Sequence, residues 1–198
     1  MIIAIKENDK VIVGYSNADS WECLSEKDYI DEENIAIGFS EDGKLFAFTN
    51  TDRISDALLY EEDFLNKEVT FKSIIREIIP YIKEKLENYK VYDEIGHWNN
   101  SLIICESDKL FDIDPSFGFY EADDYVCHGY NVETLKSVLD ETIGIPAEER
   151  IMKAVIFSCK LHNDVLFPIV IVDSKSRKCK YIFEGEKRYE CIDCVQKR

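Results

Sequence analysis

The chain has 198 residues, 45% of them hydrophobic, which is enough for one domain with a single core and too few for two. Its 40 acidic and 24 basic residues give a formal net charge of −16, which repels phosphate backbones and argues against a nucleic-acid partner. No run approaches the ~20 continuous apolar residues of a membrane helix, and no basic-then-apolar leader precedes the first apolar run. We therefore expect a cytoplasmic protein without a membrane partner.

Two hairpins are predicted at the start of the chain. Residues 1–5 and 11–14 are apolar and flank a polar segment with an Asn8-Asp9 turn. A strand that begins at the first residue must be docked in a sheet, because free termini fray. Residues 35–39 and 44–48 form the second hairpin and are apolar on successive positions. Such runs are typical of strands buried on both faces.

Two helical stretches follow these hairpins. Thr51 and Asp52 are suited to cap the first, a short helix. Thr70 precedes the second, a longer helix that Pro80 is expected to bend. Apolar residues recur at helical spacing in both. They are Ile54, Ala57 and Leu58 in the first, and Phe71, Ile74, Ile75, Ile78, Ile82 and Leu86 in the second.

The second half of the chain repeats this order. It predicts a hairpin at 101–105 and 109–113, a strand at 125–127, helices around 132–139 and 151–161, and late strands at 167–173 and 180–184. Strands alternating twice with helix pairs indicate an α+β fold, the four-layer αββα sandwich with two antiparallel sheets between helix layers. We predict one domain over residues 1–198, with 174–198 as a divergent C-terminal strand and a Cys-containing tail.

Several of these segments resemble proteasome-type subunits, including small bacterial proteasome-like proteins. The resemblance rests on their order and spacing and covers most of residues 1–173. It implies the N-terminal-nucleophile hydrolase fold and a homo-oligomer assembled through helical layers. The matching blocks are residues 1–5 with 10–14, 45–54, 101–105 with 109–113, 124–130 and 145–151.

The resemblance also implies a catalytic residue that this chain lacks. Members use a threonine, serine or cysteine as the first residue of the mature chain, and its own α-amino group accepts the proton. Here the aligned start is Met1 or Ile2, neither of which can attack a carbonyl. The family's lysine position falls in the apolar stretch from Ile35 to Ile37.

The remaining cleft positions are an orienting aspartate and a small-residue turn. The family's orienting aspartate corresponds to Ser16 by an ungapped count, or to Asp19 if a short insertion is allowed. Gly129 falls in the small-residue turn near the family's cleft. We therefore predict a non-catalytic protein of this fold that acts by assembly or by binding a peptide or protein in a vestigial cleft, and that uses no cofactor.

The alternative is an active amidohydrolase or peptidase of the same fold with another nucleophile. Ser16, Ser20 and Cys23 follow the first hairpin, and Lys27 is close in sequence. Nothing in the sequence fixes a base beside any of them.

Histidines and cysteines offer further candidates. His97 is expected in a loop, His128 in a capping or packing role and His162 at a helix C-terminus, so the three form no visible triad. Cys191 and Cys194 form a CxxC that could bind zinc or cycle as a redox pair with Cys179 upstream. Unless Cys127, His128 or a partner chain contributes, a fourth ligand is missing, so we favour a tail without metal and mostly buried, reduced thiols elsewhere.

Overall fold

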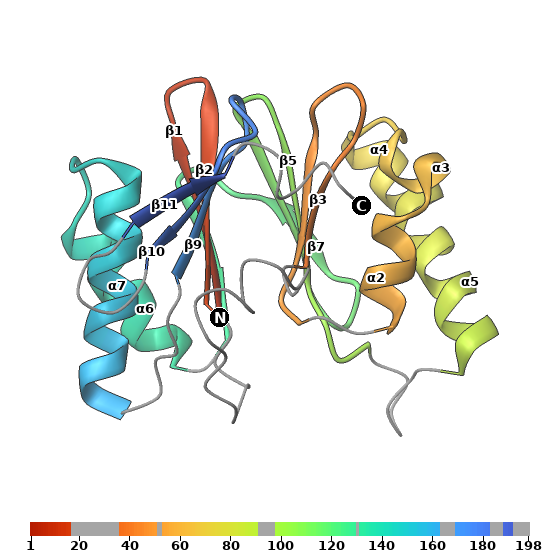
Figure 1. The fold of residues 1–198 in the computed structure, drawn as a ribbon. Coiled ribbons are helices and arrows are strands. Elements are labelled where there is room, and N and C mark those ends of the chain that lie inside the picture. The colour runs from red at the N-terminus through yellow and green to blue at the C-terminus, as the bar shows by residue number, and fades with distance from the viewer. Residues whose placement is uncertain are drawn as a thin grey trace.

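The computed structural model describes residues 1–16, 36–50, 53–90, 98–129, 131–162, 169–182 and 188–191. These residues form two antiparallel sheets packed face to face, each covered on its outer face by helices (Figure 1). The predicted αββα sandwich is therefore confirmed. None of the described helices is long and apolar enough to cross a membrane.

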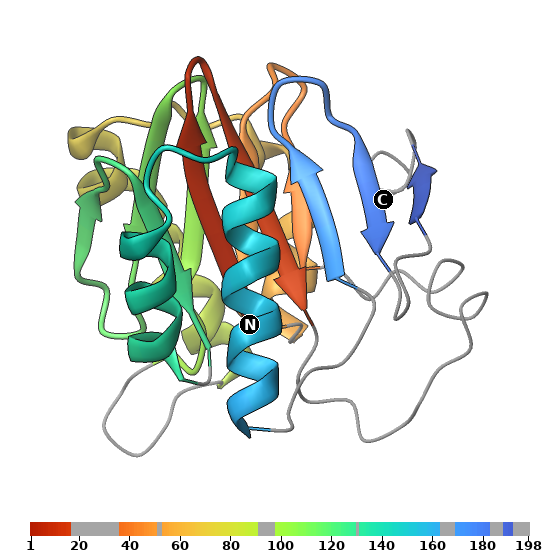
Figure 2. The ribbon, with the colours of Figure 1, turned by 90° about the vertical axis from the view of Figure 1, so that its left-hand side faces the viewer.

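The six-stranded sheet has the order β11-β10-β9-β2-β1-β8. Helices α6 (Val132–Glu141) and α7 (Ala147–His162) lie across its outer face (Figure 2). Its strands are β1 (Ile2–Glu7), β2 (Lys10–Ser16), β8 (Tyr125–His128), β9 (Ile169–Asp173), β10 (Cys179–Ile182) and β11 (Arg188–Cys191).

The five-stranded sheet has the order β3-β4-β5-β6-β7. Its strands are β3 (Ile37–Phe39), β4 (Leu45–Phe48), β5 (Leu102–Glu106), β6 (Lys109–Ile113) and β7 (Phe119–Glu121). Helices α2 (Arg53–Leu59) and α3 (Glu62–Leu65) cover its outer face together with one long helix. The long helix consists of α4 (Phe71–Ser73), the π-helical turn η1 (Ile74–Ile78) and α5 (Ile79–Tyr89).

Three apolar clusters hold the four layers together. One lies between the sheets and includes Ile2, Val13 and Ile103. The other two lie between each sheet and its helices, with Ile3 and Ile151 in one and Phe46 and Ile82 in the other. Successive strand residues point to opposite faces, so β4 and the first four residues of β1 need to be apolar at every position. This explains the continuous apolar runs in the sequence.

The structure differs from the predicted elements in four places. Strand β7 and the four-residue helix α3 were not predicted. Segment 174–198 contributes β10 and also β11, where one strand and a tail were expected. Pro80 follows the π-helical turn η1, rather than simply bending an α-helix. A proline has no N–H for the helical ladder and its ring crowds the carbonyl four residues earlier, so the wider π turn accommodates it.

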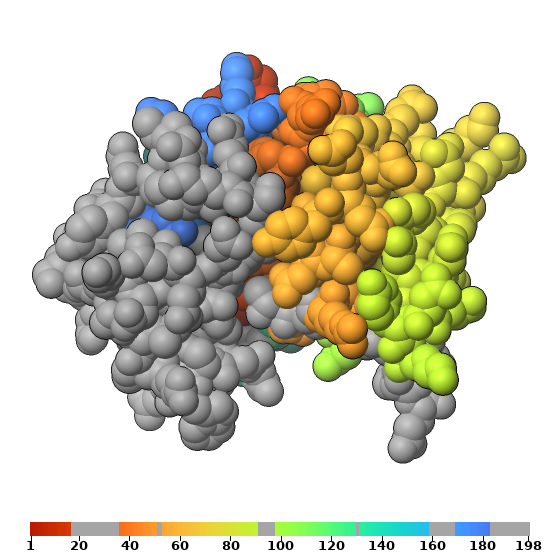
Figure 3. Space-filling view, turned by 45° about the vertical axis from the view of Figure 1, so that its right-hand side comes forward, coloured from red at the N-terminus to blue at the C-terminus, as the bar shows by residue number. Residues whose placement is uncertain are grey.

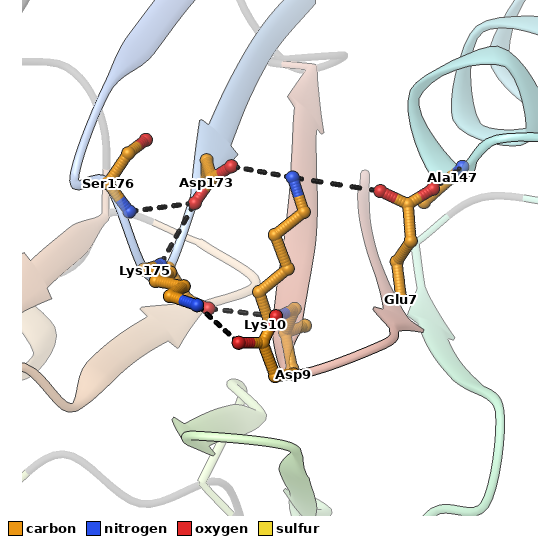
Figure 4. A network of polar contacts seen from close by, with 9 residues as sticks. Glu7, Asp9, Lys10, Ala147, Asp173, Lys175 and Ser176 are labelled. Carbon is orange, nitrogen blue, oxygen red and sulfur yellow. Dashed lines mark hydrogen bonds and ion pairs between the residues drawn. The ribbon is translucent and has the colours of Figure 1, made fainter.

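A polar network ties the first hairpin to the late strands (Figure 4). Lys10 Nζ donates to Asp173 Oδ2 at 2.8 Å and lies 3.7 Å from Glu7 Oε2. Asp173 also accepts the backbone N–H groups of Lys175 and Ser176, at 2.9 and 2.8 Å. Glu7 accepts the backbone N–H of Ala147 at the start of α7, at 2.7 Å. The N-terminal hairpin is thereby fixed to β9 and to α7.

Asp173→Asn is expected to make the free energy of unfolding vary less with pH in the acidic range. Burial raises the pKa of Asp173, but the hydrogen bonds from Lys10, Ser176 and Lys175 and the Lys10 charge outweigh it and hold the pKa below its ordinary value. With a depressed folded-state pKa, the carboxylate contributes its full stability above the unfolded pKa of ~4, and this is lost as pH falls through the folded pKa.

Asp173 is partly exposed, so we expect Asp173→Asn to cost about 1 kcal/mol at pH 7 and less towards pH 3. Urea denaturation at several pH values measures this. Asp9→Asn is the control, because Asp9 pairs with Lys175 on the exposed surface. If Asp173→Asn lowered the free energy of unfolding equally at pH 7 and pH 3, the lowered pKa of Asp173 would be contradicted.

Candidate functional site

The first residue is held between two neighbouring strands. The Met1 nitrogen donates to the Ser16 carbonyl at 2.8 Å, and the Ser16 N–H donates to the Met1 carbonyl at 2.9 Å. On the other side, Gly129 has φ +124°, and a Cβ added to it would lie 2.8 Å from the Met1 Cα. Met1 is thus enclosed by the end of β2 and by the turn that follows β8.

Hydrocarbon lines the space between the sheets next to this residue. Ile2 is fully buried there and lies opposite Tyr15 on β2 and His128 on β8. Ile37, one of the residues at the expected lysine position, is 1% exposed and belongs to the same apolar cluster as Ile2. Ile37 therefore brings no charged group into this cluster.

A polar group bridges the sheets at the same end. His128 Nε2 on β8 and Asp112 Oδ1 on β6 lie 2.6 Å apart. The Asp112 residue is 3% exposed, whereas the imidazole reaches solvent along one side. Tyr120 lies opposite Asp112 on the edge strand β7. Burial, followed by the charge of the neighbouring Asp112 carboxylate, raises the pKa of Tyr120 to about 12.

This arrangement defines what the group can do chemically. A carboxylate only accepts hydrogen bonds, so Nε2 of His128 carries a proton and donates it to Asp112. In a neutral imidazole Nδ1 is then the acceptor. An imidazole oriented by a buried carboxylate can hold a polar ligand or a proton, but acyl transfer also needs an attacking group beside it.

Strand alternation separates Ser16 from the inter-sheet space. Gly14 faces α7, since an added Cβ would lie 2.3 Å from Cγ2 of Ile151, and Ser16 shares that face. Tyr15 between them points into the inter-sheet cluster. Other candidates lie outside the residues or side chains that the structure describes. They are Asp19, Ser20, Cys23, Lys27, Ile35, His97, Cys194 and the side chains of His162 and Cys191.

Three cysteines with described side chains, Cys105, Cys127 and Cys179, are buried and free. Burial raises the pKa of the Cys105 thiol, that of Cys127 to about 11 and that of Cys179 to about 12. All three are therefore thiols rather than reactive thiolates at neutral pH. Cys179 is paired in register with Cys191 on β11. Among the described residues, no group of three or more His, Cys, Asp or Glu is placed to hold a metal ion.

Sequence reasoning did not find Asp112 or Tyr120. A signal for Asp112 was present, because it is the one charged residue in the apolar stretch from Leu110 to Ile113. A carboxyl group inside a strand that is buried on both faces requires a partner. Its partner lies 16 residues away on the other sheet, which only the fold could reveal.

No family model and no curated protein sequence matches the chain. Solved structures do match. BPH from Thiobacillus denitrificans, solved alone and in complex with epoxomicin, has a TM-score of 0.66 and 12% identity over 87% of this chain and 97% of BPH. Anbu (ancestral beta-subunit) from Yersinia bercovieri has a TM-score of 0.63 and 12% identity, with 93% and 88% covered. HslV from Trypanosoma brucei has a TM-score of 0.57 and 15% identity, with 87% and 97% covered.

These likenesses define the class of fold. The chain has the proteasome-type fold of the N-terminal-nucleophile hydrolases, as the sequence resemblance predicted. At sequence identities of 12–15%, the likeness to these structures establishes the fold alone.

Proposed function

We propose that this protein has the proteasome-type fold without its N-terminal catalysis, and that it acts in the cytoplasm by binding and by assembling with copies of itself. The supporting observation is the chemistry at the start of β1. Met1, Ile2, Ile3, Ala4 and Ile5 carry only hydrocarbon and thioether groups. Whichever of these residues led the chain, it would offer no hydroxyl or thiol to attack a carbonyl.

The surroundings of the site support the same proposal. The developing charge of an acyl-transfer reaction needs nearby donors or cations. Ile37 is hydrocarbon, and by alternation Ser16 faces the helix layer. These features suit a closed, apolar packing of the first residues rather than a reaction centre.

The alternative, a hydrolase of the same fold with another nucleophile, is less well supported. The His128–Asp112 pair resembles part of an acid–base system. The three described cysteines do not complete it, because burial keeps each of them a thiol. Ser20 and Cys23, which lie outside the described residues, are therefore the alternative nucleophiles to test.

Two measurements test the proposal. The intact mass of the purified chain should correspond to a chain without a leading serine, threonine or cysteine. Fluorogenic peptides and small amides should show no turnover above buffer, with an active proteasome-type hydrolase assayed in parallel. Ser16→Ala, Ser20→Ala and Cys23→Ala should leave this result unchanged. Turnover that one of these replacements abolishes would establish the hydrolase instead.

A further inference from the structure

We infer that Cys179 on β10 and Cys191 on β11 form a reversible disulfide, which fixes the edge strand β11 to the six-stranded sheet when the two thiols are oxidised. The two residues are Cα partners in the antiparallel ladder of these strands. Residues directly opposite each other in an antiparallel pair have Cβ atoms about 4.5–5.5 Å apart, and a disulfide joins Cβ atoms about 3.5–4.5 Å apart. A small adjustment of the two strands is therefore enough to form the bond.

The register is supported by the other residues that lie opposite each other along the two strands. Lys180 lies opposite Glu190, and Tyr181 lies opposite Tyr189. Opposite charges and aromatic pairs on neighbouring strands stabilise the alignment that brings them together. A slip by one residue would break both pairs and would turn the side chains of the slipped strand to the other face of the sheet. The alignment that keeps these pairs also places cysteine opposite cysteine.

Strand β10 is held in place by contacts that do not involve β11. Its other edge pairs with β9, and Cys179 belongs to the apolar cluster between the sheets. Lys180 Nζ donates to Glu148 Oε1 on α7 at 2.5 Å. Before the strand, Arg177 Nη2 donates to the Glu41 carbonyl at 2.9 Å, where the β9–β10 turn meets the β3–β4 turn at the rim of the molecule (Figure 3). The position of Cys179 is thus set by the body of the protein.

Strand β11, in contrast, depends on a single ladder. It is the outermost strand of its sheet, and within the described part of the chain β10 is the one strand that pairs with it. Residues 183–187 connect the two strands at one end of the ladder, and the cysteine pair lies at the other, open end. Short edge strands open at low free energy. A disulfide at the open end closes residues 179–191 into a loop and removes the opened conformations.

The oxidant in this reaction is a small-molecule disulfide of the glutathione class. Cys179 is 1% exposed, and burial raises the pKa of its thiol to about 12, so it is a poor first nucleophile. The thiolate of Cys191, on the edge strand, attacks the small disulfide, forms a mixed disulfide and releases one small thiol. Cys179 then loses its proton, attacks the Cys191 sulfur and releases the second small thiol. Two protein thiols are oxidised, and one small disulfide is reduced to two thiols that take up both protons.

Excess reduced thiol reverses these steps and opens the bond. In the cytoplasm, the location proposed above, thiols are kept reduced, and the disulfides that do form are usually transient or regulatory. The oxidised protein holds β11 covalently, whereas the reduced protein holds it by the ladder alone. The attachment of β11 therefore responds to the balance of thiol and disulfide around the protein.

Mass spectrometry of the full chain after treatment with oxidised glutathione tests the pairing. Remaining thiols are blocked with N-ethylmaleimide, and the chain is cut with chymotrypsin without reduction. Cleavage after Tyr181 and Tyr189 separates the two cysteines, so only a disulfide keeps their peptides together. We expect this linked pair in the parent chain, in Cys194→Ser and in the control Cys127→Ala, which removes a buried free thiol on β8. Cys191→Ser should abolish it, and excess reduced glutathione should remove it.

Hydrogen exchange measures the effect on the edge strand. Exchange of the β11 amides should slow at least about tenfold on oxidation, whereas exchange of β1 should not change. A linked pair that forms through Cys194, or that persists in Cys191→Ser, overturns the pairing. A parent chain that stays reduced, or that carries glutathione on Cys191 without closing the disulfide, overturns it as well. Unchanged exchange of β11 in the oxidised protein overturns the effect on the strand. Thermal denaturation verifies that each variant is folded.

Discussion

Asp112→Ala is expected to lower the free energy of unfolding by about 3 kcal/mol, because it removes the polar contact that joins the two sheets beside residue 1. Asp112 is 3% exposed and accepts a hydrogen bond from His128 at 2.6 Å. Without the carboxylate, the imidazole keeps its position between the sheets but loses its partner. The imidazole is 20% exposed, so water replaces this hydrogen bond only in part and some of the desolvation cost is left uncompensated.

The double variant Asp112→Leu/His128→Leu separates this pairing from simple packing. Replacing both members by apolar groups removes the desolvation cost as well as the hydrogen bond. We expect the double variant to be less destabilised than the sum of Asp112→Leu and His128→Leu, by at least about 1 kcal/mol in a double-mutant cycle.

Guanidinium chloride denaturation measures all of these variants. Asp108→Ala, in the exposed turn between β5 and β6, is the control for loss of an acidic side chain. If Asp112→Ala costs no more than Asp108→Ala, the inter-sheet contact has no energetic role. Additivity in the cycle would show that the two side chains act independently.

Gly129→Ala is expected to cost about 3 kcal/mol and to displace the first residue. The added Cβ would lie 2.8 Å from the Met1 Cα, a backbone atom that can move only if β1 moves. The backbone at Gly129 also has φ +124°, which strains any residue with a side chain. Overpacking against backbone and left-handed strain therefore add at one position.

Gly144→Ala provides a matched control for the strain alone. Gly144 has φ +94°, but nothing lies within 4 Å of an added Cβ. We expect Gly144→Ala to cost only about 1 kcal/mol. The difference between the two variants in chemical denaturation isolates the contact with Met1, and hydrogen exchange of β1 should increase only in Gly129→Ala. Equal costs would mean that Met1 is not confined by this turn.

Most of the fold could be predicted from local patterns. The hairpins β1–β2, β3–β4 and β5–β6 appear in the sequence as paired apolar runs around polar turns. Thr70 was also visible as the residue before the long helix, and in the structure Thr70 and Ser73 cap each other reciprocally. These features depend on residues close together in the chain, so a single sequence reveals them.

Elements that depend on tertiary context could not be predicted in this way. Strand β7 has three residues, and it forms because β6 offers Phe111 to Ile113 as a pairing edge. The π-helical turn before Pro80 forms where the helix accommodates the proline ring while it packs on the sheet. Short elements carry too little periodicity to be distinguished from loops.

The amino-acid sequence by itself determined the layered architecture and the chemistry at the start of β1, since both follow from which residues are apolar and at what spacing. Only the tertiary structure decided that His128 meets Asp112, that Gly129 closes against Met1, and that Cys179 lies opposite Cys191. These contacts join residues on different strands, loops and layers. Their existence depends on the register and packing of whole sheets, which no local pattern encodes.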